Sequence, residues 1–488
     1  MTRAWDLIVV GGGSAGLVSA YTAAELGARV ALVERHRTGG DCLWTGCVPS
    51  KALLSAAGAL ATARRAQSFA SVGEPDVDFS AVMRHVRSAI TTIEPVDSVE
   101  ALEAAGVTVL LGEATFTGPS AVSVDGAVNQ FRQAMVATGA APMIPDIPGL
   151  ADVEPLTSQT LWDIDRLPCR LLVIGAGPVG CEMAQAFARL GSAVTLVETA
   201  DRLLPREDPD ASALVTAALR RDGVDVRLSR RIVEVVGEAS GRSSGKVLLV
   251  GGPIAETVGF DTVLVATGRL ARTSGMGLDR AGVTLTSDGA VDVDRHLRTS
   301  NPRIWAAGDV TPFPHLTHLA SQHAGLATLN ALLGLRRAVD STAVPRVVYT
   351  DPEVASVGEP TWSSTPGAHP PTATRHHDHV DRAVAEGSTD GFSRLALSPR
   401  GARIVGATLV GPRAGESIAE LTLAVRRRMR VTDLAATIHA YPTYADGPYN
   451  AAVDEVRRRL AHPLAQKTVG AWLAGRRAWL GRRSTTTN

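Results

Sequence analysis

The feature that most constrains the fold of this chain is a glycine-rich pattern that occurs twice, 164 residues apart. Each copy consists of a short apolar strand, a Gly-x-Gly-x-x-Gly turn, a helical stretch and a second strand that ends in an acidic residue. The residues concerned are Gly11, Gly13, Gly16 and Glu34 in the first copy and Gly175, Gly177, Gly180 and Glu198 in the second. Such glycines permit a tight turn and the close approach of a pyrophosphate to a helix N-terminus, and the acid binds ribose hydroxyls. The repeat predicts an α/β fold with two Rossmann-like dinucleotide-binding domains.

Each copy is followed by a second short motif of the same kind. Ala137-Thr138-Gly139 comes after an apolar strand in the first half, and Ala266-Thr267-Gly268 follows the apolar run DTVLV in the second. We predict that Thr138, Gly139 and Gly268 contribute to the nucleotide sites. Two dinucleotide sites in one chain imply two reactive rings that can meet, which favours hydride transfer from a nicotinamide to a flavin.

Two of the four cysteines, Cys42 and Cys47, stand five residues apart in the stretch GGDCLWTGCVPSK. Five residues of ideal helix rise about 7.5 Å, more than the roughly 4.4–6.8 Å between the Cα atoms of a disulfide, so a bond needs a distorted turn at Gly46. Pro49 and Ser50 suit the first turn of a helix, whose dipole would favour the thiolate of Cys47. The alternatives are a buried thiol pair and half of a metal site. We predict no metal site, since no second Cys/His cluster is present to complete one.

The composition excludes several classes of function. The 49 basic residues balance 49 acidic ones, which is not the pattern of a nucleic-acid-binding protein and leaves a small molecule as the expected ligand. The apolar stretch at the N-terminus is too short for a signal sequence, and no run is long enough to span a membrane, so a cytoplasmic protein is expected. Cys169 and Cys181 lie in apolar surroundings and are expected in the core.

The stretch GGDCLWTGCVPSK resembles the redox-active motif of the pyridine nucleotide-disulfide oxidoreductases, the class I flavoprotein disulfide reductases. This family includes dihydrolipoamide dehydrogenase, glutathione reductase and mercuric reductase. The resemblance implies an FAD-dependent enzyme in which Cys42 is the interchange thiol and Cys47 the charge-transfer thiol of a redox-active disulfide. It also implies that Gly40 contacts the FAD and that Lys51 pairs with Glu182 near the flavin N5. Reduced nicotinamide would pass a hydride to FAD, and the electrons would then reach the cysteines.

The resemblance covers nearly the whole chain. TSNPRIWAAGDVT is similar to the family's second FAD motif, in which Gly308 and Asp309 would lie at the ribityl chain, and HLTHLA would follow the flavin ring. VVYTDPEVASVG resembles the start of the family's interface domain, which implies a homodimer. The implied domains are an FAD-binding domain at 1–150 and 272–341, an NAD(P)-binding domain at 151–271, an α+β interface (dimerisation) domain at 342–452 and a basic, helical tail at 453–488.

The residues after Glu198 indicate which nicotinamide cofactor is used. Thr199 and Ala200 are neutral, and no adjacent arginine is present to receive a 2′-phosphate. NADH is therefore favoured over NADPH. Arg202 is near enough in the sequence to keep NADPH as the alternative.

The chain departs from the family in the stretch IHAYPTYADGPYNAA, residues 438–452. Dihydrolipoamide dehydrogenase and glutathione reductase have a histidine before the Pro-Thr that acts as a general base across the dimer interface, oriented by a glutamate five positions later. The corresponding residues here are Tyr441 and Asp446, and His439 is the alternative base. A phenol with a pKa of about 10 is a poor proton acceptor at neutral pH, whereas an imidazole near 6.5 is well matched. Efficient turnover of lipoamide or glutathione is therefore not expected.

These features favour an NAD(P)H:acceptor oxidoreductase similar to the mercuric reductases, which resemble this chain in having a tyrosine at that position. It lacks their C-terminal cysteine pair, since no cysteine follows Cys181. The expected acceptor is a small molecule: a disulfide, a quinone or a metal ion. Dihydrolipoamide dehydrogenase is the alternative within the family. A flavin-binding redox sensor or scaffold with little turnover is the alternative of another class.

Three further segments leave alternatives open. Trp44 stands where the family often has asparagine, and it either reshapes substrate access or packs against the core. The stretch 361–381 is rich in Pro, Ser and Thr and is predicted to be a loop. Its three histidines, at positions 376, 377 and 379, suggest a metal site, but a solvated loop is the favoured interpretation. The basic tail has Trp472 and Trp479 on one helix face, and it either contacts an anionic membrane surface or docks as a terminal helix.

Overall fold

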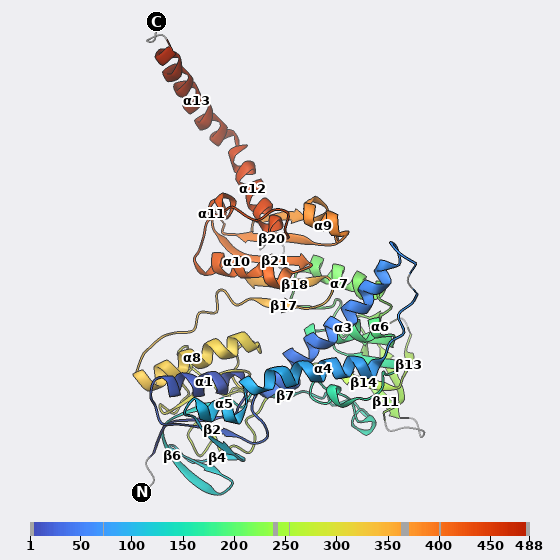
Figure 1. The fold of residues 1–488 in the computed structure, drawn as a ribbon, viewed down its shortest axis with the longest axis vertical. Coiled ribbons are helices and arrows are strands. Elements are labelled where there is room, and N and C mark those ends of the chain that lie inside the picture. Colours follow the sequence, from blue (N-terminus) through green and yellow to red (C-terminus); the bar gives the residue numbers. More distant parts are fainter. Residues whose placement is uncertain are drawn as a thin grey trace. The chain divides into compact units, whose positions relative to one another are not determined.

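The structure is a computed structural model, which describes residues 4–71, 73–237, 243–252, 254–362, 370–399 and 402–484. The chain divides into two compact units. The first contains Met1–Pro205 and Thr216–Asp340, and the second contains Arg206–Val215 and Ser341–Asn488. Figure 1 shows the helices and strands of each unit. Within the described ranges, no helix is both long and apolar enough to cross a membrane.

The first unit is built on a seven-stranded sheet whose first strand leads into the first glycine-rich turn. The strand order is β3-β2-β1-β6-β5-β4, with β16 paired to β6, and β1 runs parallel to both β2 and β6. The stretch LIVV of β1 is buried on both faces, as is typical of a parallel strand that is covered on each side. Helices α1 and α8 lie side by side on one face (Figure 1). The strands are β1 Trp5–Val10, β2 Val30–Glu34, β3 Thr108–Leu111, β4 Ala114–Gly118, β5 Ala121–Val124, β6 Ala127–Val136 and β16 Ile304–Ala306.

A second parallel sheet in the same unit leads into the second glycine-rich turn. Its order is β10-β9-β8-β14, and β8 is buried on both faces like β1. An antiparallel sheet, β11-β12-β13, and the pair β15-β7 complete the strands of this unit as described. Their bounds are β7 Ala140–Pro142, β8 Arg170–Ile174, β9 Ala193–Val197, β10 Asp225–Arg227, β11 Arg231–Gly237, β12 Gly245–Val250, β13 Glu256–Phe260, β14 Thr262–Val265 and β15 Arg269–Ala271.

The helices α1 and α6 begin directly after the two glycine-rich turns, and α2 and α3 carry the cysteine pair. Helix α7, Pro209–Arg221, begins in the second unit and ends in the first. The others are α1 Ser14–Glu25, α2 Gly40–Trp44, α3 Cys47–Ala66, α4 Phe79–Ile93, α5 Val99–Ala104, α6 Pro178–Leu190 and α8 Thr317–Leu333. Short 3-10 turns are η1 Glu94–Val96, η2 Ala151–Val153 and η3 Leu161–Asp163.

The second unit contains a five-stranded antiparallel sheet of order β17-β18-β21-β20-β19. Apolar residues of the sheet pack with those of α10 and α12 in one core. The strands are β17 Arg346–Val348, β18 Glu353–Gly358, β19 Thr372–His376, β20 Phe392–Leu397 and β21 Ile404–Gly411. The helices are η4 His377–His379, α9 Asp381–Glu386, α10 Ala414–Arg426, α11 Val431–Ala436, α12 Asp446–Leu460 and α13 Pro463–Ser484.

The prediction of a loop over 361–381 is wrong for its second half. Residues 372–376 form β19, because they pair in antiparallel register with β20, a partner that the local composition does not reveal. His377 is buried, and its Nε2 lies 3.3 Å from Ser393 Oγ, so this histidine belongs to the interior of the unit. Residues 363–369 of this stretch lie outside the described residues.

A buried polar network holds the segment Arg206–Val215 to the sheet of the second unit. The side chain of Asp208 is 1% exposed, and it accepts hydrogen bonds from Thr361 Oγ1 at 2.7 Å and Arg394 Nη1 at 2.8 Å. Arg394 Nη2 also lies 2.7 Å from Asp210 Oδ2. An ionised carboxylate in the interior requires such partners, so Arg394 compensates the burial of Asp208.

Replacing Arg394 by methionine should lower the free energy of unfolding of the second unit by about 3–5 kcal/mol, because it leaves the buried Asp208 carboxylate without its cation. Arg457→Met is the matched control. Its guanidinium is 76% exposed and 3.8 Å from Asp454, and such surface pairs contribute about 1 kcal/mol or less. Calorimetric unfolding of the two variants would measure this difference, and equal destabilisation would contradict the role of Arg394.

Candidate nucleotide and dithiol site

The first glycine-rich turn allows β1 and α1 to approach each other closely. Gly11 has a φ of +108°, and a Cβ there would collide with the carbonyl oxygen of Ala137. A Cβ on Gly16 would collide with the carbonyl oxygen of Gly11. Helix α1 begins at Ser14, and Gly13 offers no side-chain cap. The N–H groups of its first turn, which lack partners within the helix, are therefore available to an anion such as a pyrophosphate.

The second turn repeats this geometry. Gly175 has a φ of +99°, and a Cβ there would lie 2.7 Å from the carbonyl oxygen of Ala266. A Cβ on Gly180 would collide with the carbonyl oxygen of Gly175, and Gly177 precedes the first residue of α6. Gly268 follows two residues after Ala266, in the adjoining turn after β14. The sequence repeat is therefore also a repeat of backbone geometry.

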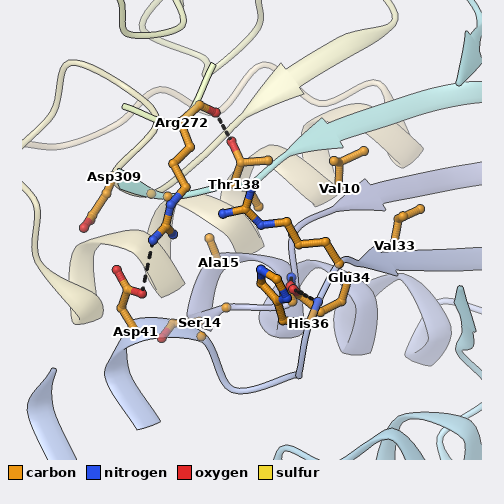
Figure 2. Close-up of a pocket in the computed structure, with 18 of the residues that line it drawn as sticks. Val10, Ser14, Ala15, Val33, Glu34, His36, Asp41, Thr138, Arg272 and Asp309 are labelled. Carbon is orange, nitrogen blue, oxygen red and sulfur yellow. Dashed lines mark hydrogen bonds and ion pairs between the residues drawn. The ribbon is translucent and has the colours of Figure 1, made fainter. Parts of the chain in front are cut away.

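The acidic residue of each copy is held in the same way by two backbone N–H groups. Glu34 accepts hydrogen bonds from Gly12 N at 2.7 Å and from His36 N at 2.9 Å. Glu198 accepts the two equivalent bonds, also at 2.7 and 2.9 Å. Each carboxylate is thus fixed beside its glycine turn, where a nucleotide ribose would bind. Figure 2 shows Glu34 and His36 at the wall of the cavity at the first turn.

This cavity has a volume of about 400 Å³ and extends from the first glycine turn to helix α2. Thr138 Oγ1 donates to the backbone carbonyl of Arg272 at 2.8 Å, and both residues appear in Figure 2. Burial raises the pKa of Asp309. Gly16 supports the turn by its close approach to Gly11 and is not part of the lining. The predicted residues that line the cavity are Gly11, Gly13, Glu34, Gly40, Cys42, Thr138, Gly139, Gly308 and Asp309.

A cluster of opposite charges in the cavity wall was not expected from the sequence. Asp41 Oδ2 accepts a hydrogen bond from Arg269 Nη2, and Arg272 Nη2 lies 3.8 Å from Asp41 Oδ1. Arg269 Nε lies 3.7 Å from Asp309 Oδ2. Burial lowers the pKa of Arg272. Since Asp41 directly precedes Cys42, this cluster fixes the helix that carries one of the two thiols.

Cys42 and Cys47 come together because the helix is interrupted between them. Helix α2 ends at Trp44 and α3 begins at Cys47, with Gly46 as its N-cap. Both cysteines are free thiols in this structure. The Sγ atom of Cys47 lies 3.2 Å from the Oγ1 atom of Thr317, the first residue of α8. The sequence placed Thr317 only within HLTHLA, the segment expected along the flavin ring, and gave no signal for its contact with Cys47, 270 residues away.

The two thiols have opposite pKa shifts. A hydrogen bond with Cys42 lowers the pKa of Cys47 to about 6, and Thr317, the charge of Lys51 and the Cys47 backbone N–H also lower it, while burial raises it. The same contact raises the pKa of Cys42 above its usual range, and burial raises it further. In the reduced pair the proton therefore belongs to Cys42 and the negative charge to Cys47.

Lys51 and Glu182 form an ion pair in the same unit. Lys51 Nζ lies 2.8 Å from Glu182 Oε2, and the side chain of Glu182 is only 5% exposed. Lys51 is one turn after Cys47 on α3, and Glu182 lies in the first half of α6, directly after the second glycine turn. The pair therefore links the helix of the thiol to the helix of the second nucleotide-binding motif.

Two tryptophans support the segment between the cysteines. Trp44 Nε1 donates to the carbonyl oxygen of Thr38 at 2.6 Å, and the guanidinium of Arg37 lies 3.6 Å from the centroid of the Trp44 ring. Trp162 Nε1 donates to the carbonyl oxygen of Thr45 at 2.9 Å. These contacts favour the packing alternative for Trp44.

The other two cysteines differ in burial. Cys181 is fully buried, which raises its pKa. Cys169 is exposed, so the prediction that it belongs to the core is wrong. Its apolar neighbours in the sequence form β8, whose burial begins only at Leu171, and Cys169 precedes that strand. Among the residues that the structure describes, no group of three or more His, Cys, Asp or Glu is arranged to hold a metal ion.

In the second unit, the structure does not pair Tyr441 with Asp446. Tyr441 Oη donates to Asp381 Oδ2 at 2.6 Å, and this hydrogen bond raises the pKa of Tyr441. Asp446 is buried at the start of α12, where its Oδ2 accepts from Thr443 N at 3.0 Å. The Nε2 atom of His439 lies 3.1 Å from both carboxylate oxygens of Glu420. Sequence reasoning missed Asp381 because it lies 60 residues before Tyr441.

These features define a class of redox enzymes that bind two nucleotides. The features are two nucleotide-binding turns, a dithiol at a helix start and a separate α+β unit. Residues 5–324 match the family "Pyridine nucleotide-disulphide oxidoreductase", and residues 344–452 match its dimerisation domain. The chain belongs to this family. It is an FAD-dependent pyridine nucleotide-disulfide oxidoreductase with a dimerisation domain, as the sequence predicted.

Relatives of more than one activity are similar to this chain. A mercuric reductase from Streptomyces lividans is 38% identical over 454 residues, which cover 91% of this chain and 94% of the relative. A dihydrolipoyl dehydrogenase from Chlamydia muridarum is 33% identical, covering 96% of this chain and all of the relative.

Solved structures of similar fold also differ in description. The crystal structure of LpdA from Mycobacterium tuberculosis has a TM-score of 0.83 at 29% identity, covering 93% of this chain and 100% of that one. The Cu(II) complex of the HOCl-induced flavoprotein disulfide reductase RclA from Escherichia coli has a TM-score of 0.82 at 25% identity, covering 93% and 99%. The family is thus shared, while the named activities of its members differ.

The residues of the cavity fit FAD. The glycine turn leaves no side chain between the start of α1 and a bound pyrophosphate, and the fixed carboxylate of Glu34 suits a ribose. At the other end of the lining, Cys42 and Thr317 lie where a redox-active ring would need a sulfur neighbour. Glu34, Thr138 and Asp309 are among the residues that would hold the cofactor.

The reduced protein should contain one thiol that ionises near pH 6 and a second that stays protonated through the neutral range. The thiolate ultraviolet absorbance of the wild type, minus that of Cys47→Ser, would measure the first ionisation. Thr317→Val should move its midpoint to higher pH, because the Thr317 hydrogen bond lowers the pKa of Cys47. Thr317→Ser keeps the hydroxyl and is the matched control. An unchanged midpoint in Thr317→Val would contradict this assignment.

Proposed function

We propose that the protein oxidises NADH and passes the electrons through a Cys42–Cys47 disulfide to a small-molecule acceptor. When bound, FAD supplies two-electron chemistry between a nicotinamide and a disulfide. The observation that carries the proposal is the position of Cys42 in the lining of the cavity that fits the cofactor, with Cys47 at the start of the next helix. The opposite directions of the pKa shifts of the two thiols support it. A dithiol with this charge distribution serves a redox enzyme, and a scaffold has no need of it.

The protonation states of the two cysteines match the products that form when a hydride equivalent reduces the disulfide. A hydride that leaves NADH carries two electrons and one proton, and the S–S bond that it finally reduces breaks into two sulfur atoms. One thiol and one thiolate therefore result without a proton from solvent. The raised pKa of Cys42 and the lowered pKa of Cys47 suit this outcome. We propose that Lys51 stabilises the thiolate and that Glu182 orients Lys51.

The second glycine turn supports NADH as the nicotinamide cofactor. The carboxylate of Glu198 is fixed by two backbone N–H groups and would accept hydrogen bonds from both ribose hydroxyls. The same charge would repel a 2′-phosphate. Arg202 donates from Nη2 to the carbonyl oxygen of Pro205 at 2.8 Å, a contact that competes with phosphate binding.

The acceptor is proposed to be a quinone, a metal ion or a disulfide that needs no imidazole base. Tyr441 is held as a hydrogen-bond donor by Asp381. Both ring nitrogens of His439 already contact acceptor oxygens, Nδ1 at the Thr437 carbonyl and Nε2 at Glu420, so neither is open to take a proton from a dithiol. We also propose that the protein acts as a homodimer through its dimerisation domain. Dihydrolipoamide dehydrogenase activity is the second candidate, favoured by the similarity to the Chlamydia muridarum relative.

Anaerobic titration with NADH tests the proposed electron path. The wild type should take up about two equivalents of NADH per subunit, one for the flavin and one for the disulfide, because each is a two-electron couple. Cys42→Ser removes the disulfide and should need only about one equivalent for the same bleaching of the flavin. NADPH should reduce the flavin more slowly than NADH. Equal stoichiometry in both proteins would exclude the disulfide from the path, and a flavin that NADH does not bleach would favour the scaffold.

Rebuilding a histidine–glutamate pair should restore activity toward disulfides. In Tyr441→His combined with Asp446→Glu, lipoamide turnover with NADH should rise on the order of 100-fold, the lower end of what general acid–base catalysis contributes. Tyr441→Phe is the control that removes the phenol without adding a base, and its lipoamide turnover should stay low. Fast lipoamide turnover by the wild type would instead show that the missing histidine does not limit the enzyme.

A further inference from the structure

The C-terminal helix α13 is exposed to solvent and contributes no residue to the proposed redox site. It spans 22 residues, Pro463–Ser484, and in Figure 1 it extends beyond α12, away from the sheet of its own unit. Its start lies beyond residue 452, the last residue matched by the dimerisation domain. Trp472 is 75% exposed, although an indole offers one of the largest apolar areas that a side chain can bury.

The large apolar side chains of α13 gather mainly on one side of the helix. The positions i, i+3, i+4, i+10 and i+11 from Val469 fall within one stripe of an α-helix. Each of these side chains is between 43% and 75% exposed. The residues are Val469, Trp472, Leu473, Trp479 and Leu480. Five large apolar side chains on one stripe form a surface that an apolar or interfacial partner would cover.

The charges of α13 have only one sign. The helix contains no Asp or Glu, and its basic residues are Lys467, Arg476, Arg477, Arg482 and Arg483. Two copies of this helix packed along the apolar stripe would bring Arg476 of each copy together and would repel. A polyanion such as nucleic acid would satisfy the cations but would leave the apolar stripe in water. An anionic bilayer surface satisfies both, since it offers negative headgroups above an apolar layer.

We propose that α13 lies in the surface of a bilayer that contains anionic lipids, with its apolar stripe toward the acyl chains. Arg476, at i+7 from Val469, stands within the stripe, and its guanidinium lies 4.2 Å from the centroid of the Trp479 ring, so the cation rests on an aromatic face there. Arginine stems can lie along apolar surface while their charged heads reach the headgroups. Because Arg476 and Arg477 stand between the two tryptophans, the helix lies along the surface and does not cross it.

Vesicle sedimentation of the full-length holoprotein tests this proposal. The protein should sediment with vesicles of phosphatidylcholine and phosphatidylglycerol, stay in solution with phosphatidylcholine alone, and be released as salt is raised. Arg476→Gln combined with Arg477→Gln should weaken binding about 25-fold, since each basic residue near such a surface contributes roughly fivefold. Trp472→Ala with Trp479→Ala should weaken it at least about tenfold, because less apolar area is buried.

The matched control is Arg87→Gln with Arg336→Gln, which removes two positive charges from exposed positions outside α13. It should bind vesicles like the wild type, and all variants should keep the rate of flavin reduction by NADH. Equal loss of binding in this control, binding to phosphatidylcholine alone, or no binding at all would overturn the proposal. Two other outcomes would also overturn it. One is release of the protein from the vesicles by duplex DNA at equal charge, and the other is formation of larger oligomers that the tryptophan variants abolish.

Discussion

The close approach of backbone to backbone at each glycine turn is the constraint on which the first unit depends. Gly16 lies so near the carbonyl oxygen of Gly11 that a single methyl group would force strand and helix apart, and Gly180 has the same relation to Gly175. The approach leaves the first N–H groups of each helix without side-chain cover, available to an anion. The same geometry places each acidic residue next to its turn, because Glu34 and Glu198 accept hydrogen bonds from backbone N–H groups of the turns. Two nucleotide sites follow from one geometric requirement that is met twice.

The dithiol illustrates how packing sets chemical reactivity. Cys47 occupies the first position of α3, but its low pKa depends chiefly on Cys42 and further on Thr317 of α8 and on Lys51. Lys51 in turn is held by Glu182 at the start of α6. These groups come from four helices, so the acidity of one sulfur atom reflects the assembly of the unit as a whole. A segment that contained α2 and α3 alone would keep Cys42 and Lys51 but would lose Thr317 and the Glu182 carboxylate that holds Lys51.

The second unit limits the chemistry that it can offer to an acceptor. The hydrogen bond from Tyr441 to Asp381 raises the pKa of the phenol and keeps its proton in place, so Tyr441 is suited to donate a hydrogen bond and not to abstract a proton. Asp446 instead binds the backbone of Thr443 at the start of α12. Relatives similar to this chain are named both as mercuric reductases and as a dihydrolipoyl dehydrogenase.

The sequence by itself determined the two nucleotide-binding turns, the family and the presence of a dithiol at a helix start, because each of these depends on residues close together in the chain. Glycines, the helix signals after Cys47 and the strand-ending acids act through local backbone geometry, which spacing reveals. Tertiary structure alone decided the partners: Thr317 for Cys47, Arg269 for Asp41 and Asp381 for Tyr441. It also turned residues 372–376 from a predicted loop into a strand. These outcomes depend on pairing between distant segments, for which a local pattern carries no signal.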